Sequence, residues 1–203
     1  MKIENILIYG SAHLTQEACK VLKSHYNLVG HIPSVNPVIA GKMDLPVVDD
    51  SIEHDIKLSI QYNRKIKDVE KSFNIHTGLL PSWGGVDILY HTIKSKKQLK
   101  NHFFEQGITF HKMTEKFDHG AIISKVTYPV IEQDTMETLY DKVLACLPAF
   151  ALSSLKLLET IKEEDINKFQ ISCPKIYKRG QIDSSDTKMY ANTLTNLKKY
   201  ETI

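Results

Sequence analysis

The chain has 203 residues, enough for one domain of ordinary size with a full hydrophobic core. Hydrophobic residues make up 42% and charged residues 25%, as is typical of a soluble globular protein. The 26 Lys and Arg residues against 24 Asp and Glu leave a net charge of +2, which argues against a dedicated nucleic-acid-binding protein.

The first part of the chain predicts a β-α-β unit. An apolar run over 6–9 ends at Gly10 and indicates a buried strand, a helical pattern follows over 15–24, and a second strand is predicted over 28–32. This opening predicts a doubly wound α/β fold, with a Rossmann-like, mostly parallel sheet and helices on both faces. Because Gly10 stands alone, the G-x-G-x-x-G fingerprint of a dinucleotide site is absent.

The next segments alternate between loops and short regular elements. Residues 33–46 carry three prolines and a glycine and are expected to form a loop, either a surface connection or the border of a ligand pocket. Residues 55–60 alternate in polarity and predict a strand. A short polar helix is expected over 64–71, with Ile66 and Val69 turned inward.

A polar pair marks the centre of the chain. Residues 73–76 alternate apolar and polar, so Asn74 and His76 are expected to leave the same face of one strand. Pro81 and the pair Gly84-Gly85 then predict a turn. An amide and an imidazole at the edge of a loop form a candidate polar site.

The second half predicts a helix, two strands and a long helix. A helix, either continuous or broken, is predicted over 86–106. Its lysines within 94–100 are expected to be solvated rather than to bind phosphate. Strands over 107–113 and 122–130 are joined by a turn that contains Asp118 and Gly120. The helix that follows runs from a cap at 134–137 to about residue 160, and Pro148 should kink or split it.

Two further features of the sequence indicate where in the cell the protein is expected. The three cysteines lie far apart without a C-x-x-C motif, so neither a zinc site nor a disulfide framework is predicted, and a reducing cytoplasm is expected. The N-terminus lacks the apolar segment of a signal peptide and no apolar run approaches 18 residues, so no membrane association is expected.

The ordered combination of motifs resembles a known family. N-x-H at 74–76, L-L-P at 79–81, G-x-T-x-H at 107–111 and D-x-G at 118–120 resemble the formyltransferases, which move a formyl group from 10-formyltetrahydrofolate to an amine. The family step of seven residues between a histidine and the aspartate is kept from His111 to Asp118. Thr77-Gly78 stands where the family usually has Pro-Ser. The resemblance extends to about residue 158, and it implies a catalytic domain over 1–160 with an extension over 161–203 packed on it.

The resemblance assigns chemistry to three residues. Asn74 and His76 would face the oxyanion that develops on the formyl group, and His76 would also move a proton. Asp118 beside it would favour the charged imidazole and relay a proton through water. No metal is required. His111 is interpreted as a structural histidine.

The resemblance also implies binding residues. The pterin of 10-formyltetrahydrofolate would be held by two loops at strand ends, and Trp83 would stack on a substrate ring or anchor its loop. The predicted folate-binding residues are Gln61, Tyr62, Asn63, Ile66, Thr114, Glu115 and Phe117. The predicted substrate-binding residues are Trp83, Gly84, Tyr177 and Lys178.

The acceptor is inferred by comparing branches of the family. The methionyl-tRNA branch carries an additional C-terminal domain, and the glycinamide ribonucleotide branch has a Gly- and Ser-rich phosphate loop that Gly10-Ser11-Ala12-His13 matches poorly. The branch that formylates nucleotide-linked amino sugars is favoured because its members often have a tail with a Tyr-Lys-Arg-type patch, like 177–179 here. The alternatives are transfer to another small amine such as glycinamide ribonucleotide, hydrolysis by a deformylase, and a non-catalytic folate- or nucleotide-binding domain. A homodimer is allowed, and no nucleic-acid partner is expected.

Overall fold

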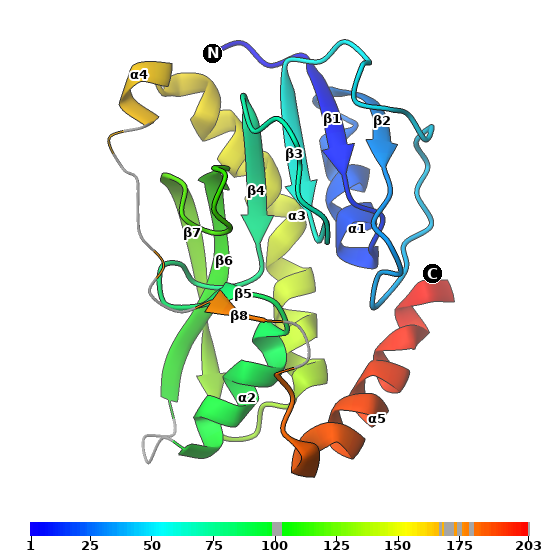
Figure 1. The fold of residues 1–203 in the computed structure, drawn as a ribbon, viewed down its shortest axis with the longest axis vertical. Coiled ribbons are helices and arrows are strands. Elements are labelled where there is room, and N and C mark those ends of the chain that lie inside the picture. The colour runs from blue at the N-terminus through cyan, green and yellow to red at the C-terminus, as the bar shows by residue number, and fades with distance from the viewer. Residues whose placement is uncertain (99–102, 167, 169–172, 174–175, 179–180, 203) are drawn as a thin grey trace.

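A six-stranded sheet in the order β2-β1-β3-β4-β6-β7 forms the centre of the computed structural model, which describes residues 1–98, 103–166, 168, 173, 176–178 and 181–202 (Figure 1). The first four strands along the chain are parallel, β6 pairs antiparallel with β4, and β7 pairs antiparallel with β6. The strands are β1 Asn5–Tyr9, β2 Asn27–Ile32, β3 Ile56–Ile60, β4 Ser72–His76, β6 Phe103–Lys112 and β7 Ile122–Ile131. The predicted α/β sheet is therefore confirmed as a mixed sheet.

The described helices and a small second sheet complete the fold. Strands β5 and β8 pair in parallel next to the carboxyl end of β4. The helices are α1 His13–Leu22, α2 Ile88–Gln98, α3 Met136–Thr160, α4 Glu163–Ile166 and α5 Thr187–Leu197, with 3-10 turns η2 Ser184–Asp186 and η3 Lys198–Thr202. The short strands are β5 Gly84–Gly85 and β8 Ile176–Tyr177.

One face of the sheet is apolar, because its strands align their hydrophobic residues. Ile8 of β1 lies beside Leu58 of β3, and Leu58 lies beside Phe73 of β4. All three side chains are buried in the main core, to which α1 and α3 also contribute. Since successive residues of a strand point to opposite faces, the neighbours of these residues lie on the other face.

The opposite face carries a row of polar side chains. The strand register places Ser59 beside Asn74, and Asn74 beside His111 of β6. A smaller apolar cluster on this face, centred on Leu7 and Tyr9 of β1 with Ile66, contains no residue of a described helix. In this region of the sheet, loops rather than described helices therefore cover the strands.

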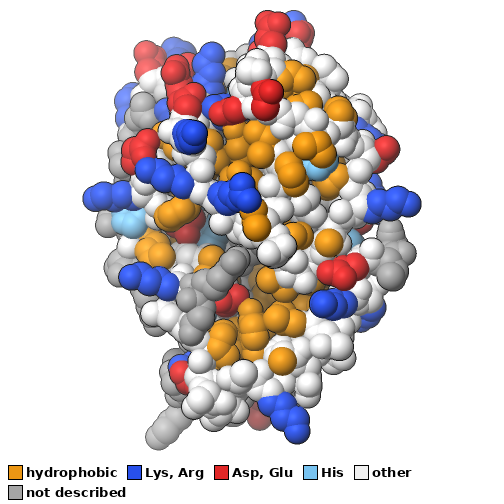
Figure 2. Space-filling view, turned by 45° about the vertical axis from the view of Figure 1, so that its right-hand side comes forward, with side chains coloured by type: hydrophobic (Ala, Val, Ile, Leu, Met, Phe, Trp, Pro, Cys, Tyr) orange, Lys and Arg blue, Asp and Glu red, His pale blue; other side chains and the backbone are white. Residues whose placement is uncertain are grey.

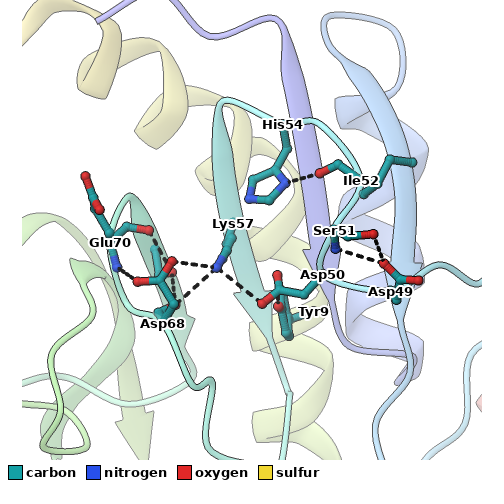
Figure 3. Close-up of polar contacts among 10 residues, drawn as sticks. Tyr9, Asp49, Asp50, Ser51, Ile52, His54, Lys57, Asp68 and Glu70 are labelled. Atoms are coloured by element: carbon teal, nitrogen blue, oxygen red, sulfur yellow. Dashed lines mark hydrogen bonds and ion pairs between the residues drawn. The ribbon is translucent and has the colours of Figure 1, made fainter.

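A buried lysine holds two of those loops. Lys57 of β3 is 4% exposed, and its Nζ lies 3.4 Å from Asp50 Oδ2 and 3.2 Å from Asp68 Oδ2 (Figure 3). The same Nζ also donates to the Asp68 carbonyl at 3.3 Å, and Tyr9 donates from its hydroxyl to Asp50. A buried cation is stable only when it is paired, so these contacts explain how Lys57 is accommodated.

Two local predictions are wrong. Residues 64–71 form a loop without a helix, because Asp68 turns its carboxylate and carbonyl to Lys57; Ile66 is nevertheless buried. Residues 103–106 belong to strand β6, which pairs with β7 from Phe103 to His111. Helix α3 is continuous through Pro148 and is not split, and a kink at that residue stays a prediction.

Helix α3 is long and apolar enough to cross a membrane by length and composition alone. In the structure it packs on α1 and on strands β6 and β7, and its inward residues, including Leu139, Leu147 and Leu155, are fully buried. This is the position of a core helix.

The C-terminal segment returns across the carboxyl ends of the parallel strands (Figure 1). Tyr190 of α5 donates to Asp87 Oδ1 at 2.7 Å, and Asn196 donates to Glu137 Oε1 of α3 at 3.2 Å. Glu201 accepts from the Ala40 amide at 3.1 Å. The segment thus contacts the domain at three places, and the division at residue 160 stays a prediction.

Candidate active site

Strand β4 places Asn74 and His76 at the carboxyl end of the parallel part of the sheet. Open α/β sheets bind ligands at this end of their strands. The two residues lie on the face opposite Phe73 and Ile75, which are buried in the core. His76 is 7% exposed, so its ring has a fixed environment.

The turn after β6 brings Asp118 to the same place. Asp118 has a φ of 57°, in the left-handed region. Two residues later stands Gly120, where a Cβ would lie 1.6 Å from the Lys112 carbonyl oxygen. Only glycine fits at such a close backbone approach. The Asp118 carboxylate accepts from the Gly85 amide through Oδ2 at 2.6 Å. Its Oδ1 lies 3.8 Å from His76 Nδ1, so the structure brings together the three residues that the sequence singled out.

His111 belongs to this site, although the sequence was interpreted as giving it a structural role. Its Nε2 lies 3.1 Å from Asn74 Nδ2 and 3.6 Å from Asp118 Oδ1. The side chain is 2% exposed, and this burial lowers the pKa of His111 to about 4. The signal that could have identified it is the seven-residue step to Asp118, combined with the pairing of β4 and β6.

The hydrogen bonds of neutral His111 define its tautomer. Its Nδ1 lies 2.9 Å from the Lys112 carbonyl oxygen, which can only accept, so Nδ1 carries the proton. Nε2 is then an acceptor and receives a hydrogen bond from the Asn74 amide. The amide of Asn74 is thereby fixed with its nitrogen toward His111.

A cleft of about 220 Å³ opens beside Asn74 and His76. Figure 2 shows hydrophobic side chains gathered across the centre of a face of the molecule, with charged ones mainly around them. Among the described residues, no Lys or Arg lines the cleft. Apart from Asn74 and His76, it is lined mainly by apolar and aromatic side chains, among them Val38, Ile39, Val86, Leu89, Tyr140, Tyr190 and Leu194. The loop over 33–46 therefore borders a cleft, which was one of its two predicted roles.

The two loops predicted to bind the pterin lie next to each other. Lys65 Nζ is 2.6 Å from Glu115 Oε2, which joins the 61–66 loop to the 114–118 loop. Gln61 and Asn63 line the cleft, while the ring of Phe117 is 60% exposed. Tyr62 also lines the cleft, Ile66 is buried, and Thr114 donates to the Lys116 carbonyl at 2.9 Å. The pterin-binding assignment stays a prediction.

The predicted substrate-binding residues take other positions. Trp83 stacks on Phe104 and Tyr177 with ring centroids 6.2 and 5.9 Å apart, and Tyr177 stacks on His91 at 3.9 Å. Gly84 is buried in the short β5–β8 pair, and it is its neighbour Gly85 that lines the cleft. Lys178 is exposed, and Arg179 lies outside the described residues. None of the four predicted residues lines the cleft, so their contact with an acceptor stays a prediction.

The loop after β1 is filled by aromatic rings of the chain itself. His13 is 2% exposed, and its Nδ1 lies 2.9 Å from the Tyr140 hydroxyl. The ring of Tyr200 stacks on His13 with centroids 5.1 Å apart. Burial lowers the pKa of His13, so a charged form that could attract a phosphate is disfavoured.

The lysines of α2 have partners within the chain. Lys94 Nζ lies 2.6 Å from Asp183 Oδ2, and Lys96 donates to the Glu132 carbonyl at 2.7 Å. The side chains of Lys97 and Lys100 lie outside the described residues. Within the parts of the chain that are described, no group of three or more His, Cys, Asp or Glu residues is arranged to hold a metal ion.

Comparison with known proteins gives a matching family model and several relatives. The model described as formyl transferase matches residues 65–151. The bifunctional polymyxin resistance protein ArnA of Wigglesworthia glossinidia brevipalpis is 30% identical over 161 residues, which is 72% of this chain and 22% of that protein. A methionyl-tRNA formyltransferase of Enterococcus faecalis is 29% identical over 102 residues, 46% of this chain and 30% of the relative. The chain thus spans less than a third of the length of these two curated relatives.

Solved structures share the fold at lower identity. WlaRD, described as a sugar 3N-formyl transferase in the presence of dTDP and 5-N-formyl-THF, has a TM-score of 0.71 and 21% identity, covering 90% of this chain and 72% of the other. An N-formyltransferase from Helicobacter canadensis in complex with folinic acid and dTDP-3-aminofucose has the same TM-score at 22% identity, covering 89% and 73%. A phosphoribosylglycinamide formyltransferase from Bacillus halodurans has a TM-score of 0.62 at 20% identity, covering 78% and 97%.

Proposed function

We propose that this chain, whose residues 65–151 match the formyl transferase family model, transfers a formyl group from 10-formyltetrahydrofolate to the primary amine of a nucleotide-linked amino sugar. The observation that carries the chemistry is the convergence of Asn74, His76 and Asp118 at one end of the sheet, with Asp118 Oδ1 3.8 Å from His76 Nδ1. A protein that only binds folate or a nucleotide has no need for these three groups together.

The reaction joins an amine nitrogen to the formyl carbon and breaks the bond between that carbon and N10. Negative charge develops on the formyl oxygen, and a proton must pass from the attacking amine to N10. One N–H of the Asn74 side-chain amide donates to His111 Nε2. The second N–H is available to donate to the developing oxyanion. His76 moves the proton, and Asp118 balances the charge that the imidazole gains while it holds that proton.

The surroundings of the site fit a two-substrate reaction. The 61–66 and 114–118 loops would hold the pterin, because strand-end loops offer backbone donors and acceptors that match the edge of a pterin ring. The cleft would receive the acceptor, since Asn74 and His76 form part of its wall. Residues 61–63 of the first loop also line it, so the two substrates would meet there. Phe117, which is exposed and next to Asp118, would stack on an aromatic part of folate.

Two observations support the choice of an amino-sugar acceptor. Of the two solved structures with a TM-score of 0.71, one is described as a sugar 3N-formyl transferase in the presence of dTDP, and the other as an N-formyltransferase in complex with dTDP-3-aminofucose. Transfer to glycinamide ribonucleotide fits less well, because Tyr140 and Tyr200 cover the loop after β1 where that branch has its phosphate loop. We also propose a cytoplasmic location and a small-molecule acceptor rather than nucleic acid.

The test is an acceptor panel with purified full-length protein and 10-formyltetrahydrofolate. We expect the free amine of a dTDP-linked amino sugar to disappear at the same rate as tetrahydrofolate forms. Glycinamide ribonucleotide and methionyl-tRNA are the competing acceptors, and a reaction without any acceptor measures hydrolysis. Faster turnover with either competing acceptor, or hydrolysis that no amine accelerates, would overturn the assignment. Folate binding without turnover under all these conditions would indicate a binding domain.

A further inference from the structure

The His76 ring is held from both sides by groups that accept hydrogen bonds. Its Nε2 lies 2.6 Å from the carbonyl oxygen of Trp83, and its Nδ1 lies 3.8 Å from Asp118 Oδ1. A carbonyl oxygen cannot donate, so Nε2 carries a proton and donates it to Trp83. The contact between Nδ1 and Asp118 is longer than a direct hydrogen bond. In the neutral ring, the nitrogen with the free lone pair is therefore Nδ1.

Gly78 is the residue that permits this contact. A Cβ at position 78 would lie 2.4 Å from the Trp83 carbonyl oxygen and 2.6 Å from His76 Nε2. Distances below 3.0 Å are not sustained by real Cβ atoms, so any larger residue would push the carbonyl or the ring away. The family pattern usually has serine at this position, where this chain has glycine.

The turn that carries the Trp83 carbonyl is fastened to strand β6. The Leu79 amide donates to Gln106 Oε1 at 2.9 Å, and the Leu80 amide donates to Thr109 Oγ1 at 3.0 Å. The Thr109 hydroxyl in turn donates to the Gly78 carbonyl at 2.8 Å, and the Trp83 amide donates to the Leu79 carbonyl at 3.1 Å. The carbonyl oxygen of Trp83 is therefore a rigid acceptor rather than the tip of a free loop.

We propose that Gly78 and the Trp83 carbonyl are positioning groups that assign the reactive nitrogen of His76, so that the proton of the acceptor amine is taken by Nδ1. The hydrogen bond made by one imidazole nitrogen decides which tautomer the other presents. Nδ1 accepts the proton as the bond between amine nitrogen and formyl carbon forms, and it returns the same proton to N10 as the bond between that carbon and N10 breaks. The ring ends each turnover neutral. The reaction step rests on the proposed function, whereas the tautomer does not.

The first test needs no substrate. Nitrogen-15 NMR of histidine-labelled wild-type protein distinguishes a protonated Nε2 from a protonated Nδ1. We expect neutral His76 to be protonated at Nε2, with His76→Gln used to assign its signals. Neutral His76 protonated at Nδ1 would overturn the proposal, whatever acceptor the enzyme uses.

The second test compares two glycine substitutions of similar local strain. Gly78→Ala should displace the Trp83 carbonyl, mix the His76 tautomers and lower kcat about ten- to a hundredfold, as for other small displacements of reacting groups, with little change in the KM for folate. Gly30→Ala is the control, because its Cβ would meet Val48 Cγ1 at 2.6 Å and neither residue lines the cleft that contains His76. Equal losses of kcat in both variants, or an unchanged His76 tautomer in a slow Gly78→Ala protein, would overturn the positioning role. An inactive wild type with protonated Nε2 would instead refute the proposed function and leave the tautomer assignment standing.

Discussion

Asn74 and His111 lie directly opposite each other on the antiparallel strands β4 and β6, and Asn74 Nδ2 lies 3.1 Å from His111 Nε2. Because His111 Nδ1 donates to the Lys112 carbonyl at 2.9 Å, the imidazole presents an acceptor to the amide. The strand pairing therefore determines which way the Asn74 amide points, and with it where its second N–H lies.

The first prediction follows from this pair. His111→Leu removes the acceptor while keeping an apolar residue of similar bulk in a buried position. We expect kcat to fall about ten- to a hundredfold because Asn74 loses its fixed orientation, with folate binding largely kept. Steady-state kinetics and folate titration check this. His111→Gln, which can still offer an acceptor to Asn74, should retain more activity; equal activity of the leucine and glutamine variants would argue against an orienting role.

The second prediction concerns pH and stability. Burial lowers the pKa of His111 to about 4 in the folded protein, whereas the unfolded value is about 6.5. Between these values the unfolded chain binds a proton that the folded protein does not, so the His111 contribution to the free energy of unfolding rises with pH. It is lost progressively as the pH falls from about 6.5 to about 4. Urea unfolding across this window should show a steeper pH dependence for wild type than for His111→Gln, and parallel curves would contradict the shift.

The parts of the fold that the sequence predicted are those with strong periodicity. The alternation over 73–76 predicted strand β4 and the shared face of Asn74 and His76, because the side-chain period of a strand is two. The helix expected over 64–71 failed because its polar residues serve a tertiary contact, the pairing of Asp68 with buried Lys57. Sequence spacing carries no information about such a contact between separate loops.

The site was predicted in part for a similar reason. The family motifs indicated Asn74, His76 and Asp118, which the structure brings together. The contact of His111 with Asn74 depends on the register between two strands that are far apart in the chain. The carbonyl of Trp83 is a backbone group, so its hydrogen bond to His76 leaves no trace in residue types apart from the glycine at position 78.

The third prediction concerns the wall of the cleft. Leu194 lines the cleft from α5, whereas Thr195 on the same helix is exposed and does not. Leu194→Ala should raise the KM for the acceptor about three- to tenfold through lost apolar contact, while the KM for folate stays within twofold. Kinetics with each substrate varied in turn measures this, with Thr195→Ala as the matched control. Equal effects on both substrates would place the acceptor elsewhere.

The last prediction separates a catalytic Asp118 from an ordinary turn residue. His76→Ala and Asp118→Ala should lose turnover while folate binding stays nearly intact, because both groups act on charge and protons that appear only in the transition state. General acid-base help is typically worth about a hundred- to ten-thousandfold, which sets the scale for His76→Ala. These alanine variants do not exclude a local change in backbone shape, since Asp118 has a φ of 57°.

Asp118→Asn is the sharper change, because asparagine also tolerates the left-handed region and keeps the side-chain shape. It retains an oxygen that can accept from the Gly85 amide, now 2.6 Å from Asp118 Oδ2, but it removes the negative charge 3.8 Å from His76 Nδ1. We therefore expect a lower kcat together with a shifted pH–rate profile, measured with 10-formyltetrahydrofolate and an amino-sugar nucleotide. If Asp118 were a turn residue without a catalytic role, this substitution would leave turnover nearly unchanged. Wild-type turnover and an unshifted pH–rate profile in Asp118→Asn would therefore rule out the proposed role of Asp118 in proton transfer.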